Sequence, residues 1–393
     1  MILRTIFLYY WCLSACNGQT GDDVKSLVTQ LFTTNTYKKN VRPNADQTKP
    51  MQVDLDFYLV GINGIDEITQ KLTTTGFLFI SWTDEYLTWN SASYGNLEYI
   101  YVSQSDIWKP DITLQNGFSK LKELGDSFIN VQILPTGEIT WLPTEVFETK
   151  CNIDIKYFPF DRQTCEIVFV VWSSSILDVN VTKGSRGILL EALDPNGVWS
   201  VVSTSAGDDV LSSESRVVFT ITLERSSAYY VMNVIVPVIL LGILNVFTFV
   251  IPADSGEKMG YSITVFLAFA VFLTIISSEL PKTSGSLLGY YLMFQMGIGT
   301  FVVAVTAFEL RIHHRKDKVP YKIQRIFRSK CKTRVKSSDK NFDNPEKDKE
   351  NEDGEKTWSD ITSTTDFILF WISLVSTFIV TVTILGLLSS KYK

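Results

Sequence analysis

The stretch CNIDIKYFPFDRQTC runs from Cys151 to Cys165 and holds two of the five cysteines of the chain. A disulfide between its two ends would close a loop of ~15 residues, which stabilises the fold by about 3 kcal/mol in the chain-entropy model. The alternative is a pair of buried, unpaired thiols. Because disulfides persist only in oxidising compartments, the choice depends on whether this part of the chain is exported.

The N-terminus favours export, since residues 1–19 are typical of a secretory signal peptide. Arg4 precedes an apolar run over residues 6–15, and small or polar residues follow it. A membrane anchor is the alternative, but about 10 residues are too few to cross a bilayer core of ~30 Å as a helix. The residues before Cys16 also resemble a bacterial lipoprotein box, whereas the sequon at Asn180 predicts N-glycosylation.

Four long apolar stretches follow the exported half. They cover residues 229–251, 259–280, 287–308 and 367–390, and each is long enough to span a bilayer as a helix. The segment 311–366 is charged, with its Lys and Arg residues concentrated before residue 341 and its Asp and Glu residues after it. The positive-inside rule therefore predicts a cytoplasmic, partly disordered loop, in which Cys331 stays reduced.

The exported segment, residues 20–227, is predicted to be a β-sandwich. From Met51 to Leu59 apolar residues alternate with Gln52, Asp54, Asp56 and Tyr58. A period of two residues is typical of strands with one buried and one wet face. The expected architecture is an immunoglobulin-like sandwich over residues 20–227, with transmembrane helices 1–3 within residues 228–310 and the fourth after the loop.

Composition excludes several classes of function. The chain of 393 residues is 45% hydrophobic and 20% charged, and its net charge of −6 offers no large basic face for nucleic acid. Its two histidines, His313 and His314, adjoin the third apolar stretch. No phosphate-binding glycine loop, nucleophile elbow or zinc-protease motif is present. We therefore expect neither an enzyme nor a protein with a cofactor, a metal site or a nucleic-acid partner.

Four short motifs make the sequence recognisable. They are the Phe158-Pro159-Phe160-Asp161 core between the two cysteines, Trp82-Thr83-Asp84 with Leu87 and Trp89, Trp108-Lys109-Pro110-Asp111-Ile112, and Pro252-Ala253-Asp254-Ser255-Gly256-Glu257-Lys258. Together they resemble the Cys-loop receptor superfamily of pentameric ligand-gated ion channels, and nicotinic acetylcholine receptor subunits most. The resemblance covers residues 25–390. It implies a plasma-membrane channel built with four further subunits, identical or different, among membrane lipids.

The second apolar stretch carries a stripe that would line a pore. At steps of three and four residues it presents Gly260, Thr264, Leu267, Val271, Thr274 or Ile275, and Ser278. Five copies would form a water path with an apolar constriction, although such a stripe can also be a helix-packing face. Glu257 would add a carboxylate ring that favours permeant cations. The resemblance implies that Lys258 points away from the axis.

The predicted ligand site is less complete. The resemblance implies a site made of Trp172, Gln115, Glu214, Phe77, Thr140 and Leu142. Acetylcholine receptors hold a cationic amine in an aromatic cage, but Gln115 and Phe77 stand where Tyr and Trp are usual, and the hairpin over residues 204–216 has no Cys or Tyr. Trp172 can alternatively be a core residue. We expect a cation channel opened by a small molecule other than acetylcholine, or a non-conducting accessory subunit.

Overall fold

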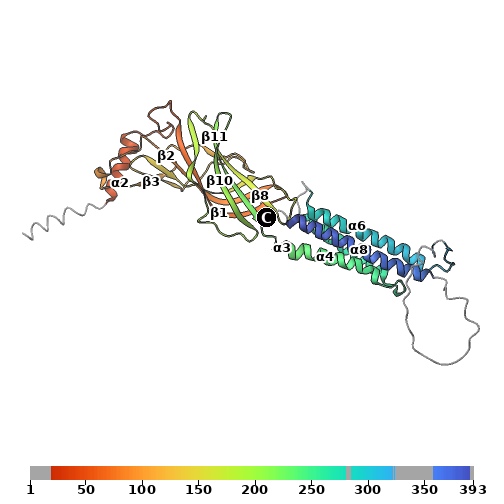
Figure 1. Cartoon of the computed structure of the whole chain (residues 1–393). Helices are drawn as coiled ribbons and strands as arrows, with labels where there is room; N and C mark the ends of the chain where they lie inside the picture. Colours follow the sequence, from red (N-terminus) through yellow and green to blue (C-terminus); the bar gives the residue numbers. More distant parts are fainter. Residues whose placement is uncertain (1–18, 280–284, 322, 324–356, 390–393) are drawn as a thin grey trace, which may run out of the picture. The chain divides into compact units, whose positions relative to one another are not determined.

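The computed structural model describes residues 19–279, 285–321, 323 and 357–389 (Figure 1). Residues 1–18, Cys331 and most of the acidic half of the long loop lie outside this description, as do the side chains of Ser278 and Glu279. The chain divides into two units. The first ends at Ser226 and omits Ile155–Phe160, and these six residues belong with the second unit, which continues from Ser227.

The first unit is a β-sandwich, as predicted, preceded by helix α2 (Gly21–Val28) and the helical turn η1 (Thr29–Thr34). One sheet has seven strands in the order β3 (Ile100–Ser103), β5 (Asn130–Ile133), β6 (Glu138–Trp141), β2 (Lys71–Thr83), β1 (Met51–Asp66) and β9 (Val179–Leu189), with β7 (Thr144–Lys150) also paired to β2. The other has four strands in the order β10 (Trp199–Leu211), β11 (Glu214–Arg225), β8 (Arg162–Val171) and β4 (Ile112–Leu114).

The apolar alternation of β1 points into the space between the sheets. Phe57 of β1 and Phe147 of β7 come from the larger sheet, and Phe169 of β8 and Phe219 of β11 from the smaller one. All four rings are buried, and Phe57 lies with its centroid 5.6 Å from that of Phe147 and 5.7 Å from that of Phe219. Buried aromatic side chains contribute a large share of core stability, so this cluster joins the two layers.

One residue of β1 departs from the predicted pattern. Asp56 falls on the wet face of the strand, yet it is buried. Its Oδ1 accepts hydrogen bonds from the backbone N–H groups of Arg186 and Gly187. A Cβ at Gly184 would lie 2.3 Å from the Asp56 carboxylate, so any other residue there would have to displace this carboxylate. The alternation could not reveal this burial because β9, the strand that covers Asp56, is far away in the sequence.

The second unit contains four helices that are long and apolar enough to cross a membrane, counted over the described residues. The first runs through α3 (Ala228–Tyr230), η3 (Val231–Ile235), α4 (Val236–Phe247) and η4 (Thr248–Val250), and η5 (Ala253–Ser255) leads into α5 (Lys258–Glu279). Then follow α6 (Leu287–His313) and α8 (Trp358–Ser389), which run alongside each other in Figure 1.

Two helices extend beyond the apolar stretches that predict them. Helix α6 continues past residue 308 to His313, and α8 begins at Trp358 rather than at residue 367. Trp358 and Ile361 pack with Val319 in a small buried cluster, and the Trp358 indole N–H donates to the Asp317 carbonyl at 2.7 Å. Packing against the segment that follows α6 therefore stabilises a first turn of α8 whose own composition is mixed.

Candidate functional site

Trp172 lies just after β8 with 55% of its surface exposed, so its ring is not part of the sandwich core. Its backbone N–H donates to the Asp111 carbonyl at 3.1 Å, and the N–H of Ser173 donates to the Asp111 carboxylate. Together with the buried Trp141, it lines a pocket of about 290 Å³. The segment Trp108–Ile112 thus fixes the backbone of the tryptophan that the sequence singled out.

Gln115 and the hairpin of β10 and β11 are joined by Arg216, a residue that the sequence analysis did not select. Its Nε donates to Asp209 Oδ2 at 2.8 Å, and its Nη1 donates to Gln115 Oε1 at 3.2 Å. The hydrogen bond from Arg216 lowers the pKa of the Asp209 carboxyl, which favours the carboxylate form of Asp209. The guanidinium group therefore links the β10–β11 hairpin to the segment that follows β4.

The six predicted ligand residues fall into two groups on different sheets. Trp172, Gln115 and Glu214 lie at or beyond the ends of β8, β4 and β11 in the four-stranded sheet. Phe77 of β2, Thr140 of β6 and Leu142 lie on or next to the seven-stranded sheet. This separation is what a site shared between neighbouring subunits requires, because each subunit would then offer one face to each neighbour.

Phe77 belongs to a cluster of aromatic rings. It stacks on Tyr58, with ring centroids 4.5 Å apart and an interplanar angle of 11°. The Tyr58 hydroxyl lies 3.2 Å from Arg186 Nη1, and the Arg186 guanidinium lies 4.8 Å from the centroid of the Phe79 ring. The buried Asp56 holds the backbone of Arg186 in place. A second guanidinium group therefore stands close to the predicted ligand residues.

The two cysteines form the predicted disulfide, with Cα atoms 5.2 Å apart. The loop between them contains a cis peptide bond at Phe158–Pro159. Within the second unit, the Phe158 ring lies 4.8 Å from that of Tyr230, and the Leu287 N–H donates to the Lys156 carbonyl at 2.9 Å. The middle of the loop thus packs against the first and third membrane helices.

A buried ion cluster closes the first unit at Arg225, the last residue of β11. Its Nε donates to Asp161 Oδ1 and its Nη1 lies beside Glu67 Oε1, both at 2.8 Å. Burial by itself lowers the pKa of Arg225, but the hydrogen bonds and charges of Asp161 and Glu67 outweigh burial and raise it. The local sign of this cluster in the sequence is a single cation a few residues before an apolar span.

Helix α5 leaves the predicted stripe uncovered by the other helices of its own subunit. Glu257, just before its first turn, is exposed, as are Gly260, Thr264, Leu267, Val271, Thr274 and Ile275, whereas Val265, Phe269 and Ile276 face the bundle and are buried. The side chain of Ser278 lies outside the described residues. The Thr264 hydroxyl donates to the Gly260 carbonyl at 2.8 Å. The stripe is therefore not a packing face within one subunit.

Lys258 takes the opposite direction from its neighbour Glu257. Its side chain is fully buried, and Nζ lies 2.8 Å from Glu309 Oε2 of α6 and also contacts Asp366 of α8. The Lys258 ammonium group is thus enclosed between two carboxylates from two other helices. Of the two adjacent charges, only the carboxylate of Glu257 is left exposed.

Both ring nitrogens of His313 have structural partners. Nε2 lies 2.7 Å from Asp254 Oδ1 in η5, and Nδ1 lies 3.0 Å from the Thr362 hydroxyl in α8. His313 therefore joins three elements at this end of the bundle. Asn180, the predicted glycosylation site, lies on β9 and donates from Nδ2 to Gln52 Oε1 at 2.9 Å, and its glycosylation stays a prediction.

Comparison with known proteins agrees with this arrangement. Residues 24–227 match the neurotransmitter-gated ion-channel ligand binding domain, and residues 234–353 match the neurotransmitter-gated ion-channel transmembrane region. The chain is 30% identical to neuronal acetylcholine receptor subunit beta-4 of Homo sapiens and 31% identical to subunit beta-2 of Rattus norvegicus, over 76% of its length and 61% of theirs. It is 30% identical to acetylcholine receptor subunit delta of Gallus gallus over 80% of its length and 65% of that subunit.

The chain thus spans about three fifths of the length of the first two relatives. An extracellular ligand-binding domain and four membrane helices describe a multi-pass protein of the plasma membrane, and the matched family consists of ion channels rather than enzymes. Two family models that together cover most of the sequence, in the same order as the two units, place it without ambiguity. The chain belongs to the neurotransmitter-gated ion-channel family.

Proposed function

We propose that this chain is a pore-forming subunit of a cation-selective pentameric channel that opens when a small molecule other than acetylcholine binds outside the cell. The observation that carries the proposal is the opposite placement of two adjacent charges. Lys258 is buried between Glu309 and Asp366, while Glu257 is exposed. Five exposed carboxylates around one axis would attract cations and repel anions.

The uncovered face of α5 supports a conducting role. In five copies, Leu267 and Val271 would form an apolar ring in mid-helix, with the small residues Gly260 and Thr264 on one side. An apolar neck excludes water when it is narrow, and a hydrated cation cannot cross it in that state. Opening then requires only a modest widening, which gives the channel two states that a ligand can bias.

The ligand face supports an agonist different from acetylcholine. A quaternary amine is held by several aromatic faces, but here the Arg216 guanidinium binds Gln115, and the exposed Trp172 lies two residues beyond Val170, the strand partner of Arg216. A cation on that face would have to compete with the Arg216 guanidinium for the Asp209 carboxylate. Asp208 is exposed and Glu214 partly exposed, so solvent weakens the attraction of these two carboxylates for a cation.

Ion substitution tests selectivity directly. Cells that express the chain, alone and with nicotinic partner subunits, would be screened with a ligand panel under voltage clamp. The reversal potential should then follow the external Na⁺ gradient and stay unchanged when chloride is replaced by a large anion. A reversal potential that follows chloride would contradict the proposed selectivity.

A non-conducting accessory subunit is the second candidate. The hydrogen bonds of Arg216 to Gln115 and Asp209 favour it, because a ligand face whose polar groups already bind one of its own side chains would give a subunit with no agonist of its own. In that case the chain would change the currents of partner subunits but carry none alone. The variant Val271→Cys, which places a cysteine on the exposed side of α5, distinguishes the two functions. Block of current by a charged thiol reagent means that this α5 lines the conducting pore, and the absence of block means that it does not.

A further inference from the structure

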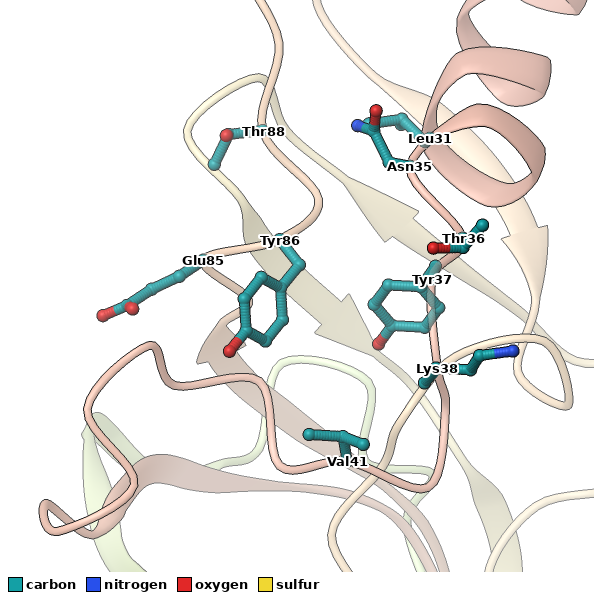
Figure 2. A pocket seen from close by; sticks show the side chains of 9 residues that line it. All are labelled: Leu31, Asn35, Thr36, Tyr37, Lys38, Val41, Glu85, Tyr86 and Thr88. Atoms are coloured by element: carbon teal, nitrogen blue, oxygen red, sulfur yellow. The ribbon is translucent and has the colours of Figure 1, made fainter.

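A second pocket, of about 490 Å³, lies next to the helical turn η1 (Figure 2). Its walls come from three segments of the first unit: the end of the helical turn η1, the chain that follows it, and the loop after β2. The lining residues are Leu31, Asn35, Thr36, Tyr37, Lys38, Val41, Glu85, Tyr86 and Thr88. Pockets of 300–1,000 Å³ are the usual size for small-molecule ligands.

Hydrogen bonds fix the back wall of this pocket. The Tyr37 hydroxyl donates to Asp84 Oδ2 at 2.6 Å and accepts from the Trp108 N–H at 3.1 Å. The other oxygen of the buried Asp84 accepts from the Tyr86 N–H at 2.9 Å. Burial raises the pKa of Tyr37, and the hydrogen bond to Asp84 raises it further, so this phenol stays neutral. The wall is therefore rigid and preformed.

The hydroxyls of both tyrosines have partners, and the Tyr37 ring also packs edge-on against the Phe32 ring, with centroids 5.6 Å apart. The Tyr86 hydroxyl donates to the Asn44 carbonyl at 3.1 Å, and the Tyr37 hydroxyl has the two partners just described. Figure 2 shows the two rings on opposite sides of the open space, with Val41 beneath them in that view. Between them the pocket offers ring surface and aliphatic carbon rather than free hydroxyls.

The charged residues of the lining do not point between the rings. Figure 2 shows the side chains of Lys38 and Glu85 directed away from the space between Tyr37 and Tyr86. Glu85 Oε2 accepts from the Ala45 N–H at 2.6 Å, so its carboxylate already has a partner. A charged ligand would lose hydration on entering and meet no counter-charge there, which is unfavourable.

We propose that this pocket is a second ligand site, distinct from the predicted agonist site, and that it takes an uncharged, flat aromatic molecule between the rings of Tyr37 and Tyr86. Stacked or edge-on contacts with both rings would orient the ligand, and Leu31 and Val41 would cover its ends. Asn35 and Thr36 at the rim leave room for one polar substituent.

Photolabelling of the full-length receptor in membranes tests the site with a readout that does not depend on channel current. The probe is benzophenone, and labelled peptides are quantified by mass spectrometry. We expect saturable labelling of the peptides that contain Tyr37 and Tyr86. Indole, which is uncharged, should compete at least about tenfold better than benzyltrimethylammonium or benzoate. Equal competition by either charged compound would overturn the proposed ligand class.

Two variants and a matched control complete the experiment. Tyr86→Ala removes one ring and should reduce pocket labelling about tenfold, the effect expected from loss of a stacked aromatic contact. Val41→Trp fills the pocket and should reduce labelling at least as much. Tyr99→Ala removes an exposed tyrosine outside the lining and should change nothing. Surface pentamers of each variant are counted first, so that loss of folding is not mistaken for loss of binding. Labelling unchanged in both pocket variants would overturn the site.

Discussion

The pore helix and the ligand face differ in how far a linear pattern could predict them. On α5 the predicted stripe is not covered by the other helices. The two charged residues before it lie in opposite environments, since Glu257 is exposed and Lys258 is buried. On the ligand face Trp172 is exposed, but Arg216 donates hydrogen bonds to both Gln115 and Asp209. A helix fixes the neighbours of a residue by spacing alone, whereas a sheet surface is assembled from strands far apart in sequence.

The largest effect is expected at the ligand face. Acetylcholine should activate the receptor ~10³-fold more weakly than it would with a full aromatic cage, since one buried cation–π contact is worth about 2 kcal/mol and two or three are missing. Concentration–response curves measure this. The double variant Gln115→Tyr, Arg216→Ala should regain part of the sensitivity. A response of the unmodified chain to micromolar acetylcholine would remove the contrast between the two regions.

The next effect concerns the charge cluster behind the pore helix. Lys258→Met leaves the carboxylates of Glu309 and Asp366 buried without a cation. Breaking a buried ion pair costs about 3–5 kcal/mol, so we expect a large loss of surface pentamers, measured by surface biotinylation. Adding Glu309→Gln and Asp366→Asn removes the stranded charges and should restore part of the assembly. No recovery in this triple variant would mean that shape rather than charge determines the effect.

A smaller effect is expected at the apolar ring. Leu267 is 55% exposed on α5, and Leu267→Thr would place five hydroxyls in the neck and favour the wetted, open state. A shift of ~1.4 kcal/mol changes the closed–open ratio tenfold, so we expect leak current without ligand. The control is Val265→Thr on the buried side of α5, which should lower expression without a leak. The reverse pattern would mean that we have the wrong face of the helix.

The smallest effect is on conductance. Glu257→Ala removes five carboxylates from one end of the pore and should lower the single-channel cation current. Asp254→Asn is the matched control, because the Asp254 carboxylate is already bound to His313 and should contribute less. Equal currents in the two variants would mean that the exposed Glu257 does not face the ions.

Much of this protein followed from local pattern. The β-sandwich followed from residues alternating with a period of two, the four membrane helices from apolar length, and the disulfide from two cysteines in an exported segment. Local geometry fixes these features, since a strand alternates its faces and a helix needs about 20 apolar residues to cross a bilayer. The family likewise followed from motifs that are contiguous in the chain.

Tertiary structure alone decided which charges are buried and with what. Asp56 lies under β9, Arg225 binds Asp161 and Glu67, and Arg216 spans from Asp209 to Gln115. The partners in these groups are mostly tens of residues or more apart, and no spacing rule connects them. A charge enters the protein interior only where a partner from another element compensates for lost hydration, so its position depends on packing that the linear sequence does not display.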